Sequence, residues 1–482
     1  MVLMRLVIRA AGLINMIILA RLLVPEDFGL VAMAMIFVGA IEALSEFNFD
    51  VVLIKNRDAR RHHYDTAWTL SIIRGAVMAA LLLVIAEPAA GLFDEPRLEP
   101  IIAVLSLSSL LLGFQNIAVV DFRKSLDFKR DFIFMAGDKM VAVAVTVAIA
   151  LIWRNYWALV AGILGGKLWR LGASYVMHTF RPRLSLLAWR ELFRFTKWLL
   201  LHNILLFARN RMDRVIIGKM LGPATLGLYT IAFDLANLVT TELMVPIRRA
   251  LFPGYAKIAV EPERMRRLFI DIFGLTFWIG APVAVGVGLV AAPLIHLLFG
   301  SDWSAAVPIT QMLVIAGFIA LLSSGSHPVY LALGRPELQT LIGGLSAGLL
   351  LPGLIIAVQA EGVVGAAIAV VLAQTIVALV DITLIMILLK LKLGELIGAC
   401  WRSLVALGVM SASANLVIPG LPVNHGLAGD VFLLLSTVMI GGASYLLCSF
   451  SLWRLFGHEK TPERLIWQSL HQTLSMVKSR LA

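Results

Sequence analysis

Two related stretches lie 198 positions apart in this chain, ARLLVPEDFGLVAMA at residues 20–34 and GKMLGPATLGLYTIA at residues 218–232. Six positions agree when arginine is counted with lysine: Arg21 with Lys219, Leu23 with Leu221, Pro25 with Pro223, Gly29 with Gly227, Leu30 with Leu228 and Ala34 with Ala232. In each copy an apolar segment ends, a proline turn follows and a second apolar segment begins, because proline interrupts one helix and starts the next. The repeat is therefore predicted to be a helical hairpin that occurs twice.

The composition is that of an integral membrane protein, since 60% of the 482 residues are apolar and only 15% are charged. A transmembrane helix needs about 20 predominantly apolar residues. Fourteen such runs are predicted, at residues 1–22, 28–54, 66–87, 98–120, 132–152, 156–180, 195–221, 226–250, 269–299, 304–332, 337–359, 361–390, 396–418 and 428–453. The expected fold class is an all-α polytopic membrane protein with about 14 transmembrane helices.

Basic residues concentrate in alternate loops, such as KNRDARRHHYD at 55–65, DFRKSLDFKRD at 121–131 and RPRLSLLAWRELFR at 181–194. Cytoplasmic loops are enriched in Lys and Arg, so these loops are predicted to face the cytoplasm, together with both chain termini. The expected location is the bacterial cytoplasmic (inner) membrane. The net charge of +11 then reflects topology and attraction to anionic membrane lipid, and no nucleic-acid partner is expected.

The first apolar run is predicted to be a transmembrane helix and not a cleavable signal peptide, because it is long and has no small-residue cleavage site. The second repeat has a basic lead-in at residues 194–197 that the first lacks, so we expect a few residues to precede Met1. Cys400 and Cys448 both fall in predicted spans. No disulfide framework and no metal site is therefore expected.

Three segments carry a resemblance to a known family: ARLLVPEDFG at 20–29, RNRMDRVIIGKMLGPATLGLYTIA at 209–232 and LALGRPE at 331–337. They resemble the Wzx-type polysaccharide flippases of the multidrug, oligosaccharidyl-lipid and polysaccharide exporter superfamily, over residues 1 to about 450. The resemblance implies a fold like that of the multidrug exporters of this superfamily, with two pseudo-symmetric six-helix lobes around a central cleft. The implied domains are an N-lobe at 1–182, a C-lobe at 190–392, two further helices at 396–456 and a cytoplasmic tail at 457–482, whose spacing of apolar residues predicts an amphipathic helix.

The resemblance also implies a function. Such proteins translocate a polyprenyl-pyrophosphate-linked oligosaccharide by alternating access, for lipopolysaccharide, capsule or exopolysaccharide biosynthesis. Polymerase and glycosyltransferase proteins of the same pathway are the implied partners. No cofactor is expected, although a proton or sodium gradient is a candidate energy source.

Cations inside the predicted spans suit this function, because a charge at mid-bilayer costs at least about 2.5–3.5 kcal/mol on insertion scales and should face protein or water. The residues expected to form a cationic, substrate-binding cleft are Arg9, Arg74, Lys139, Lys167, Arg209, Arg211 and Arg214. Arginine binds the adjacent oxygens of a pyrophosphate bidentately. Internal ion pairing and snorkelling are the alternatives for these residues, and Arg170 is expected to anchor the protein to lipid.

Polar and acidic residues in the spans are candidates for ion coupling: Asn15, Glu42, Glu46, Asp213 and Asp234. Glu42 and Glu46 are four residues apart on one helix face and could hold a proton or a sodium ion, or instead pair with an arginine of a neighbouring helix. Asp213 could pair with Arg209 on its own helix. Asn15 occupies the position equivalent to Asp213 in the first repeat.

Three other functions stay open from the sequence. A flippase for a peptidoglycan lipid precursor has similar cargo chemistry. A drug or cation antiporter shares the architecture, but it would favour an acidic or aromatic cleft. A membrane glycosyltransferase or polymerase is the enzyme alternative, although the longest predicted outer segments have only about a dozen residues and no GxxxxGKS phosphate loop occurs.

Overall fold

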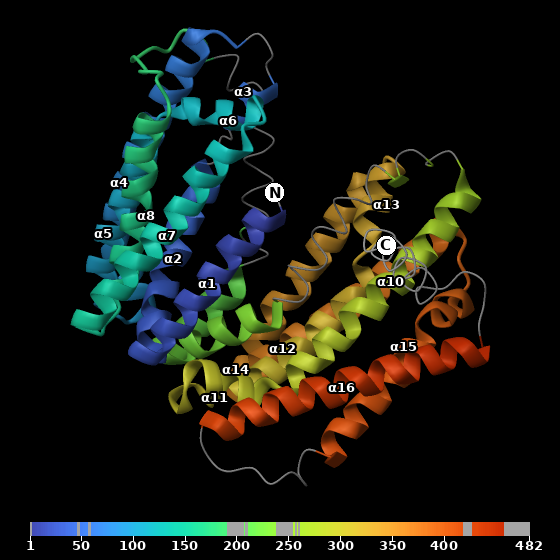
Figure 1. Ribbon diagram of the computed structural model, residues 1–482. Helices are drawn as coiled ribbons and strands as arrows, with labels where there is room; N and C mark the ends of the chain where they lie inside the picture. Colours follow the sequence, from blue (N-terminus) through green and yellow to red (C-terminus); the bar gives the residue numbers. More distant parts are fainter. Residues whose placement is uncertain are drawn as a thin grey trace, which may run out of the picture. The chain divides into compact units, whose positions relative to one another are not determined.

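A computed structural model of the chain (Figure 1) describes residues 2–45, 49–55, 59–189, 207, 211–237, 254–255, 258, 261–417 and 427–456. All regular elements within these residues are helices. Eight described helices are long and apolar enough to cross a membrane, and a bent pair, Leu98–Phe114 with Ile117–Lys124, adds a ninth if it forms one span. The all-α multi-pass fold is thereby confirmed, while the number of fourteen helices stays a prediction.

The chain divides into two compact units. The first comprises Met1–Thr230 and Leu298–Asp302, and the second comprises Ile231–Leu297 and Trp303–Ala482. The residues that follow 189, at the predicted boundary between the lobes, lie outside the described residues, as does the tail at 457–482. The assignment of the two lobes stays a prediction.

The helices of the first unit are α1 (Val2–Leu22), α2 (Pro25–Ser45), α3 (Phe49–Lys55), α4 (Arg61–Phe93), α5 (Leu98–Phe114), η1 (Ile117–Val120), α6 (Asp121–Lys124), α7 (Phe128–Trp153), α8 (Trp157–Met177) and the first part of the helical segment Arg211–Asn237. Helix α4 packs along α5, and α7 packs along α8. Gly75 of α4 lies directly against Gly113 of α5, because residues without side chains allow helix backbones to approach closely.

Helix α4 of this unit is longer than the apolar part of a bilayer is thick. Helix α4 has 33 residues and is therefore about 50 Å long, whereas the hydrocarbon core is about 30 Å thick. Both of its ends must reach the polar interfaces. Figure 1 shows the short helices α3 and α6 gathered at one end of the α4, α5, α7 and α8 group.

The helices of the second unit are α10 (Pro262–Leu289), α11 (Ala291–Phe299, of which the last two residues belong to the first unit), η2 (Ser301–Trp303, divided likewise), α12 (Ala306–Ala320), η3 (Leu321–Ser323), α13 (Ser326–Ala332), α14 (Pro336–Leu389), α15 (Leu393–Val417) and α16 (Leu427–Phe456). The 54-residue α14 is interrupted at Glu361 and Gly362, where Gly362 adopts a φ of 59°. This break separates the two spans predicted at 337–359 and 361–390.

Both proline turns of the repeat form as predicted. Helix α1 ends at Leu22, and Pro25 is the first residue of α2, a position where proline has no hydrogen bond to lose. In the second copy, Gly222 adopts a φ of 79° immediately before Pro223. A positive φ is readily accessible to glycine, so this residue allows the sharp turn inside the segment Arg211–Asn237.

The two turns pack against each other reciprocally. A Cβ atom on Gly29 would overlap the backbone carbonyl of Pro223, and a Cβ atom on Gly227 would overlap the backbone carbonyl of Pro25. The glycines that define the repeat are therefore needed for a backbone contact between its two copies.

Acidic residues of the first turn fasten the neighbouring loops. Asp27 accepts hydrogen bonds from the backbone N–H groups of Val24, at 3.2 Å, and Tyr156, at 3.0 Å. Glu26 accepts a bond of 2.6 Å from Arg97, which also pairs with Glu95 at 2.7 Å. Because Tyr156 precedes α8 and Arg97 precedes α5, one turn holds the ends of both helix pairs.

We predict that Gly227→Ala destabilises the protein. The added methyl group must displace a backbone carbonyl, and overpacking of this kind costs about 1–3 kcal/mol or more. The melting temperature of the detergent-purified protein should fall. Gly172→Ala on α8 is the matched control, because nothing lies within 4 Å of its Cβ position; equal effects of the two substitutions would contradict the contact.

A second prediction concerns the pH dependence of the loop between α4 and α5. The hydrogen bond from Arg97 lowers the pKa of Glu95 below its usual value. The stabilisation is therefore complete above the unfolded-state pKa of about 4.3 and is lost as the pH falls through the lower, folded-state pKa. At pH 7 the melting temperature of Arg97→Gln should be lower than that of the wild type. The difference between the two melting temperatures should shrink below about pH 4. A difference that grows on acidification would contradict this sign.

Candidate functional site: a cavity lined by three arginines

A partly open cavity of about 270 Å³ lies in the first unit, where residues of α3 and α6 meet those of α4, α5, α7 and α8. It is lined by Phe49 and Asp50 of α3, Ser71 and Arg74 of α4, Leu112 of α5, Gln115, Ile117, Val119 and Val120 near η1, Arg123 of α6, Asp131 and Phe134 of α7, and Arg170 of α8. We refer to it as the three-arginine cavity. Seven elements between residues 49 and 177 thus contribute to one site.

Two carboxylates face three guanidinium groups in this cavity, and both pair with the same arginine. Arg123 lies 3.2 Å from Asp131 and 3.7 Å from Asp50. Asp131 is only 5% exposed, so its charge requires a partner in the protein. The lining charges sum to one positive charge, which makes the cavity attractive to an anion.

Arg170 is held in the cavity wall by weaker contacts. Its guanidinium is 4.0 Å from Asp138, at the outer limit of an ion pair, and lies over the ring of Phe134 at 5.5 Å. Its Nε atom is buried and has no hydrogen-bond partner among the residues that the structure describes. Buried polar atoms of this kind are rare in proteins, so Arg170 has donor capacity that a ligand could use.

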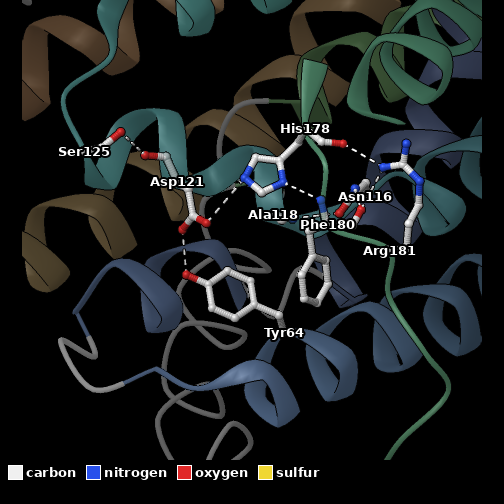
Figure 2. Close-up of polar contacts among 8 residues, drawn as sticks. All are labelled: Tyr64, Asn116, Ala118, Asp121, Ser125, His178, Phe180 and Arg181. Carbon is white, nitrogen blue, oxygen red and sulfur yellow. Dashed lines mark hydrogen bonds and ion pairs between the residues drawn. The ribbon is translucent and has the colours of Figure 1, made fainter. Parts of the chain in front are cut away.

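A polar cluster beside the cavity joins α6 to α4 and to the segment after α8, as Figure 2 shows. The Tyr64 hydroxyl donates a hydrogen bond of 2.6 Å to one carboxylate oxygen of Asp121, and the His178 Nε2 atom lies 3.6 Å from the other. The backbone N–H of Phe180 donates to His178 Nδ1 at 3.1 Å. Because Nδ1 accepts, the neutral ring carries its proton on Nε2, facing Asp121.

Asn116 completes this cluster from a fully buried position. Its side-chain oxygen accepts from the backbone N–H of Ala118 and so caps η1, while its amide nitrogen donates to the Phe180 carbonyl at 2.7 Å. The backbone N–H of Asn116 donates to Ser174 of α8 at 3.0 Å. These contacts tie η1 and α6, and with them Arg123, to α4 and to the end of α8.

Two of the predicted cations, Arg74 of α4 and Lys167 of α8, belong to helices that form the cavity wall. Arg74 is half-buried and lines the three-arginine cavity; its role in binding substrate stays a prediction. Lys167 of α8 is half-buried and interacts electrostatically with Arg170, Glu42 and Asp138. Glu42 therefore lies near a lysine of a neighbouring helix, where we had considered an arginine partner.

Lys139 and Asn15 are also half-buried. The Lys139 side chain lies beside Gly12 of α1, 3.5 Å from the position of a Cβ atom there. The side-chain oxygen of Asn15 is buried. Asp234 is exposed. The predicted residues Arg9, Arg209 and Glu46 lie outside the part of the chain whose side chains are described.

The acid of the second repeat accepts a hydrogen bond from a tyrosine, and its pairing with Arg209, which lies outside the described residues, stays a prediction. Asp213 is 5% exposed and accepts a hydrogen bond of 3.0 Å from the hydroxyl of Tyr229, across the turn at Gly222. Arg214 and the exposed Arg211 both interact with its charge. These two arginines thus partly neutralise Asp213.

The sequence did not single out the residues that complete the cavity. Arg123 and Asp131 belong to the predicted cytoplasmic loop at 121–131, Asp50 lies near the end of the predicted span 28–54, and Arg170 was expected to anchor the protein to lipid. The segment DFRKSLDFKRD at 121–131 carried the one available signal. It mixes three acids with four bases, whereas the topology of a loop depends on its bases alone.

We predict that Tyr64→Phe lowers the stability of the first unit, because it removes a short hydrogen bond to a carboxylate. The cost should be about 1–2 kcal/mol, as is usual for a bond to a charged group that is partly solvated. Tyr175→Phe is the matched control, since the Tyr175 hydroxyl donates to the neutral carbonyl of Phe114. Thermal unfolding should show the larger decrease for Tyr64→Phe, and the reverse order would contradict the role of Asp121.

Residues 18–308 of the chain match the family described as Polysaccharide biosynthesis protein. Among characterised relatives, the Lipopolysaccharide biosynthesis protein WzxC of Escherichia coli K12 is 23% identical over 77% of this chain and 76% of its own length. The Succinoglycan biosynthesis transport protein ExoT of Rhizobium meliloti is 25% identical over 62% of this chain and 61% of its own length.

Solved structures share the fold at low sequence identity. The Lipid II flippase MurJ, in an inward closed conformation, aligns with a TM-score of 0.73 and 13% identity over 95% of this chain and 100% of its own. An inward-facing multidrug resistance transporter of the MATE family aligns with a TM-score of 0.62 and 13% identity, over 79% and 94%. The family match spans more than half of the chain, and this multi-pass membrane protein therefore belongs to the polysaccharide biosynthesis protein family, with the fold of the multidrug, oligosaccharidyl-lipid and polysaccharide exporter superfamily.

Proposed function

We propose that the protein is a flippase that moves a polyprenyl-pyrophosphate-linked saccharide across the cytoplasmic membrane by alternating access. The saccharide would serve lipopolysaccharide, capsule or exopolysaccharide biosynthesis. Family membership supports this proposal, as do the biosynthesis and transport names of WzxC and ExoT. The fold shared with MurJ and with a multidrug transporter suits transport by alternating access.

The observation that carries the proposal is the position of three cations in the first unit. The half-buried Arg74 and Arg170 and the more exposed Arg123 line one partly open cavity. Placing arginine inside a membrane protein is costly, and it suits an anionic cargo whose charge the arginine offsets. A diphosphate that joins a saccharide to its lipid is such a cargo.

The cation excess argues against the drug or cation antiporter, because a cationic cargo favours acidic surroundings. A flippase for a peptidoglycan lipid precursor would carry the same diphosphate chemistry, so the saccharide distinguishes that alternative. A glycosyltransferase or polymerase would act on the saccharide covalently. Each alternative therefore leaves a different lipid-linked product in cells that lack the protein.

The charge distribution supports an orientation with both termini in the cytoplasm of a bacterial cell, and the pathway supplies polymerase and glycosyltransferase partners. We also propose that transport is coupled to a proton or sodium gradient. Glu42 is its candidate residue, because this half-buried carboxylate lies near Lys167. Protonation of Glu42 would leave the lysine charge unbalanced and so change the local energetics.

Deletion of the gene should cause complete lipid-linked saccharides to accumulate in the inner leaflet of the cytoplasmic membrane. The measurement is mass spectrometry of extracted lipids, combined with a periplasmic enzyme or lectin that modifies only saccharides exposed on the outer leaflet. Re-expression of the wild-type chain should clear the accumulated lipid and restore the outer-leaflet signal.

Other outcomes would contradict the flippase. Accumulation of incomplete saccharides would indicate an enzyme of the pathway. Accumulation of a peptidoglycan precursor alone would identify that lipid as the cargo. Unchanged lipids with altered drug tolerance would favour the antiporter.

A further inference from the structure

The size of the three-arginine cavity limits what it can hold. Its volume is about 270 Å³, just below the range of about 300–1,000 Å³ that is usual for pockets binding drug-sized ligands. A lipid-linked oligosaccharide is much larger than such a ligand. A phosphate or diphosphate group fits, since the space equals that of roughly nine water molecules at about 30 Å³ each.

The chemistry of the lining selects an oxyanion. Guanidinium groups present several N–H donors in a plane and match two phosphate oxygens at once. Ser71 and Gln115 add neutral hydrogen-bonding groups to the wall. Phe49, Leu112 and Phe134 provide apolar surface on which a lipid chain beside the phosphate could rest.

Arg123 already has two anionic partners, Asp50 and Asp131, at 3.7 Å and 3.2 Å. An incoming phosphate would compete with Asp50, which is the more distant and the more exposed of the two. Asp131 is buried and would stay paired. Asp50 belongs to the short helix α3, so exchange of this ion pair requires movement of only a small element.

We propose that the three-arginine cavity is a binding site for the phosphate of an anionic lipid head, with Arg170, Arg74 and Arg123 as its ligands. The predicted orientation places this end of the unit at the cytoplasmic interface, where such heads are found. Two lipids supply the chemistry, the diphosphate-linked cargo and the anionic phospholipids of the membrane. The inference that the bound lipid is the cargo rests on the proposed function. The inference that the cavity binds a phosphate does not.

The test measures binding of farnesyl diphosphate to the full-length protein in neutral detergent by isothermal titration calorimetry. Arg170→Gln should weaken binding about ten- to a hundredfold, the loss expected when hydrogen bonds to a charged group are removed. Arg74→Gln should also weaken it. Arg130→Gln is the matched control, because Arg130 is an exposed arginine of α7 that does not line the cavity.

Arg170→Lys keeps the proposal testable if the glutamine variant does not fold. This variant retains the charge but not the planar pair of donors, so it should bind farnesyl diphosphate with an intermediate affinity. Equal affinities of wild type, Arg170→Lys and Arg74→Gln for farnesyl diphosphate would overturn the site. Equal losses in Arg170→Gln and Arg130→Gln would also overturn it, because they would indicate non-specific attraction.

Two further arms identify the source of the phosphate. Binding is repeated in nanodiscs of phosphatidylcholine alone and of phosphatidylcholine with phosphatidylglycerol. Loss of farnesyl diphosphate binding in the second disc supports a phospholipid site, and unchanged binding supports the cargo head. Wild-type clearance of accumulated saccharide without any diphosphate binding would refute this inference alone. Binding that is specific to the cavity, with no accumulation after gene deletion, would refute the proposed function alone.

Discussion

The contact between the two proline turns is the constraint on which the first unit depends. Gly29 lies against the carbonyl of Pro223, and Gly227 lies against the carbonyl of Pro25. No side chain fits in either place, so the two backbones approach as closely as main-chain atoms permit. The first turn also fastens the loops before α5 and α8 through Glu26 and Asp27. One short turn therefore sets the position of two helix pairs, whose far ends form the three-arginine cavity.

The fold was predictable where its determinants are local. Proline and glycine mark the turns, and hydropathy marks the spans, including the break near residue 361 that divides α14. The cavity was not predictable, because it depends on which helix ends meet. Arg123 belongs to a loop-like basic segment, and only the packing of α3 and α7 beside α6 brings Asp50 and Asp131 to it. Arg170 resembles a lipid anchor in the sequence, yet it lies beside Phe134 and Asp138.

Charge inside this unit is arranged in partly compensated groups. Asp138 lies near both Lys167 and Arg170, and Glu42 lies near Lys167. Such half-buried charge pairs contribute little net stability, because desolvation offsets their attraction. Their presence is better explained by a need for charge in the interior. A small cation excess then remains available to an anion, while the acids reduce the repulsion between the cations when no anion is bound.

The two ends of the first unit differ in how they are held. At the end with the proline turns, backbone atoms meet backbone atoms through glycines, and such a contact cannot shift without clashes. At the cavity end, η1 and α6 are held by side chains, through Tyr64, Asp121, His178 and Asn116. Hydrogen bonds and ion pairs between side chains exchange partners at low cost, particularly near water. A ligand that binds the arginines would therefore act first on α3, which is joined to Arg123 by a solvated ion pair of 3.7 Å through Asp50, before it could act on the turns.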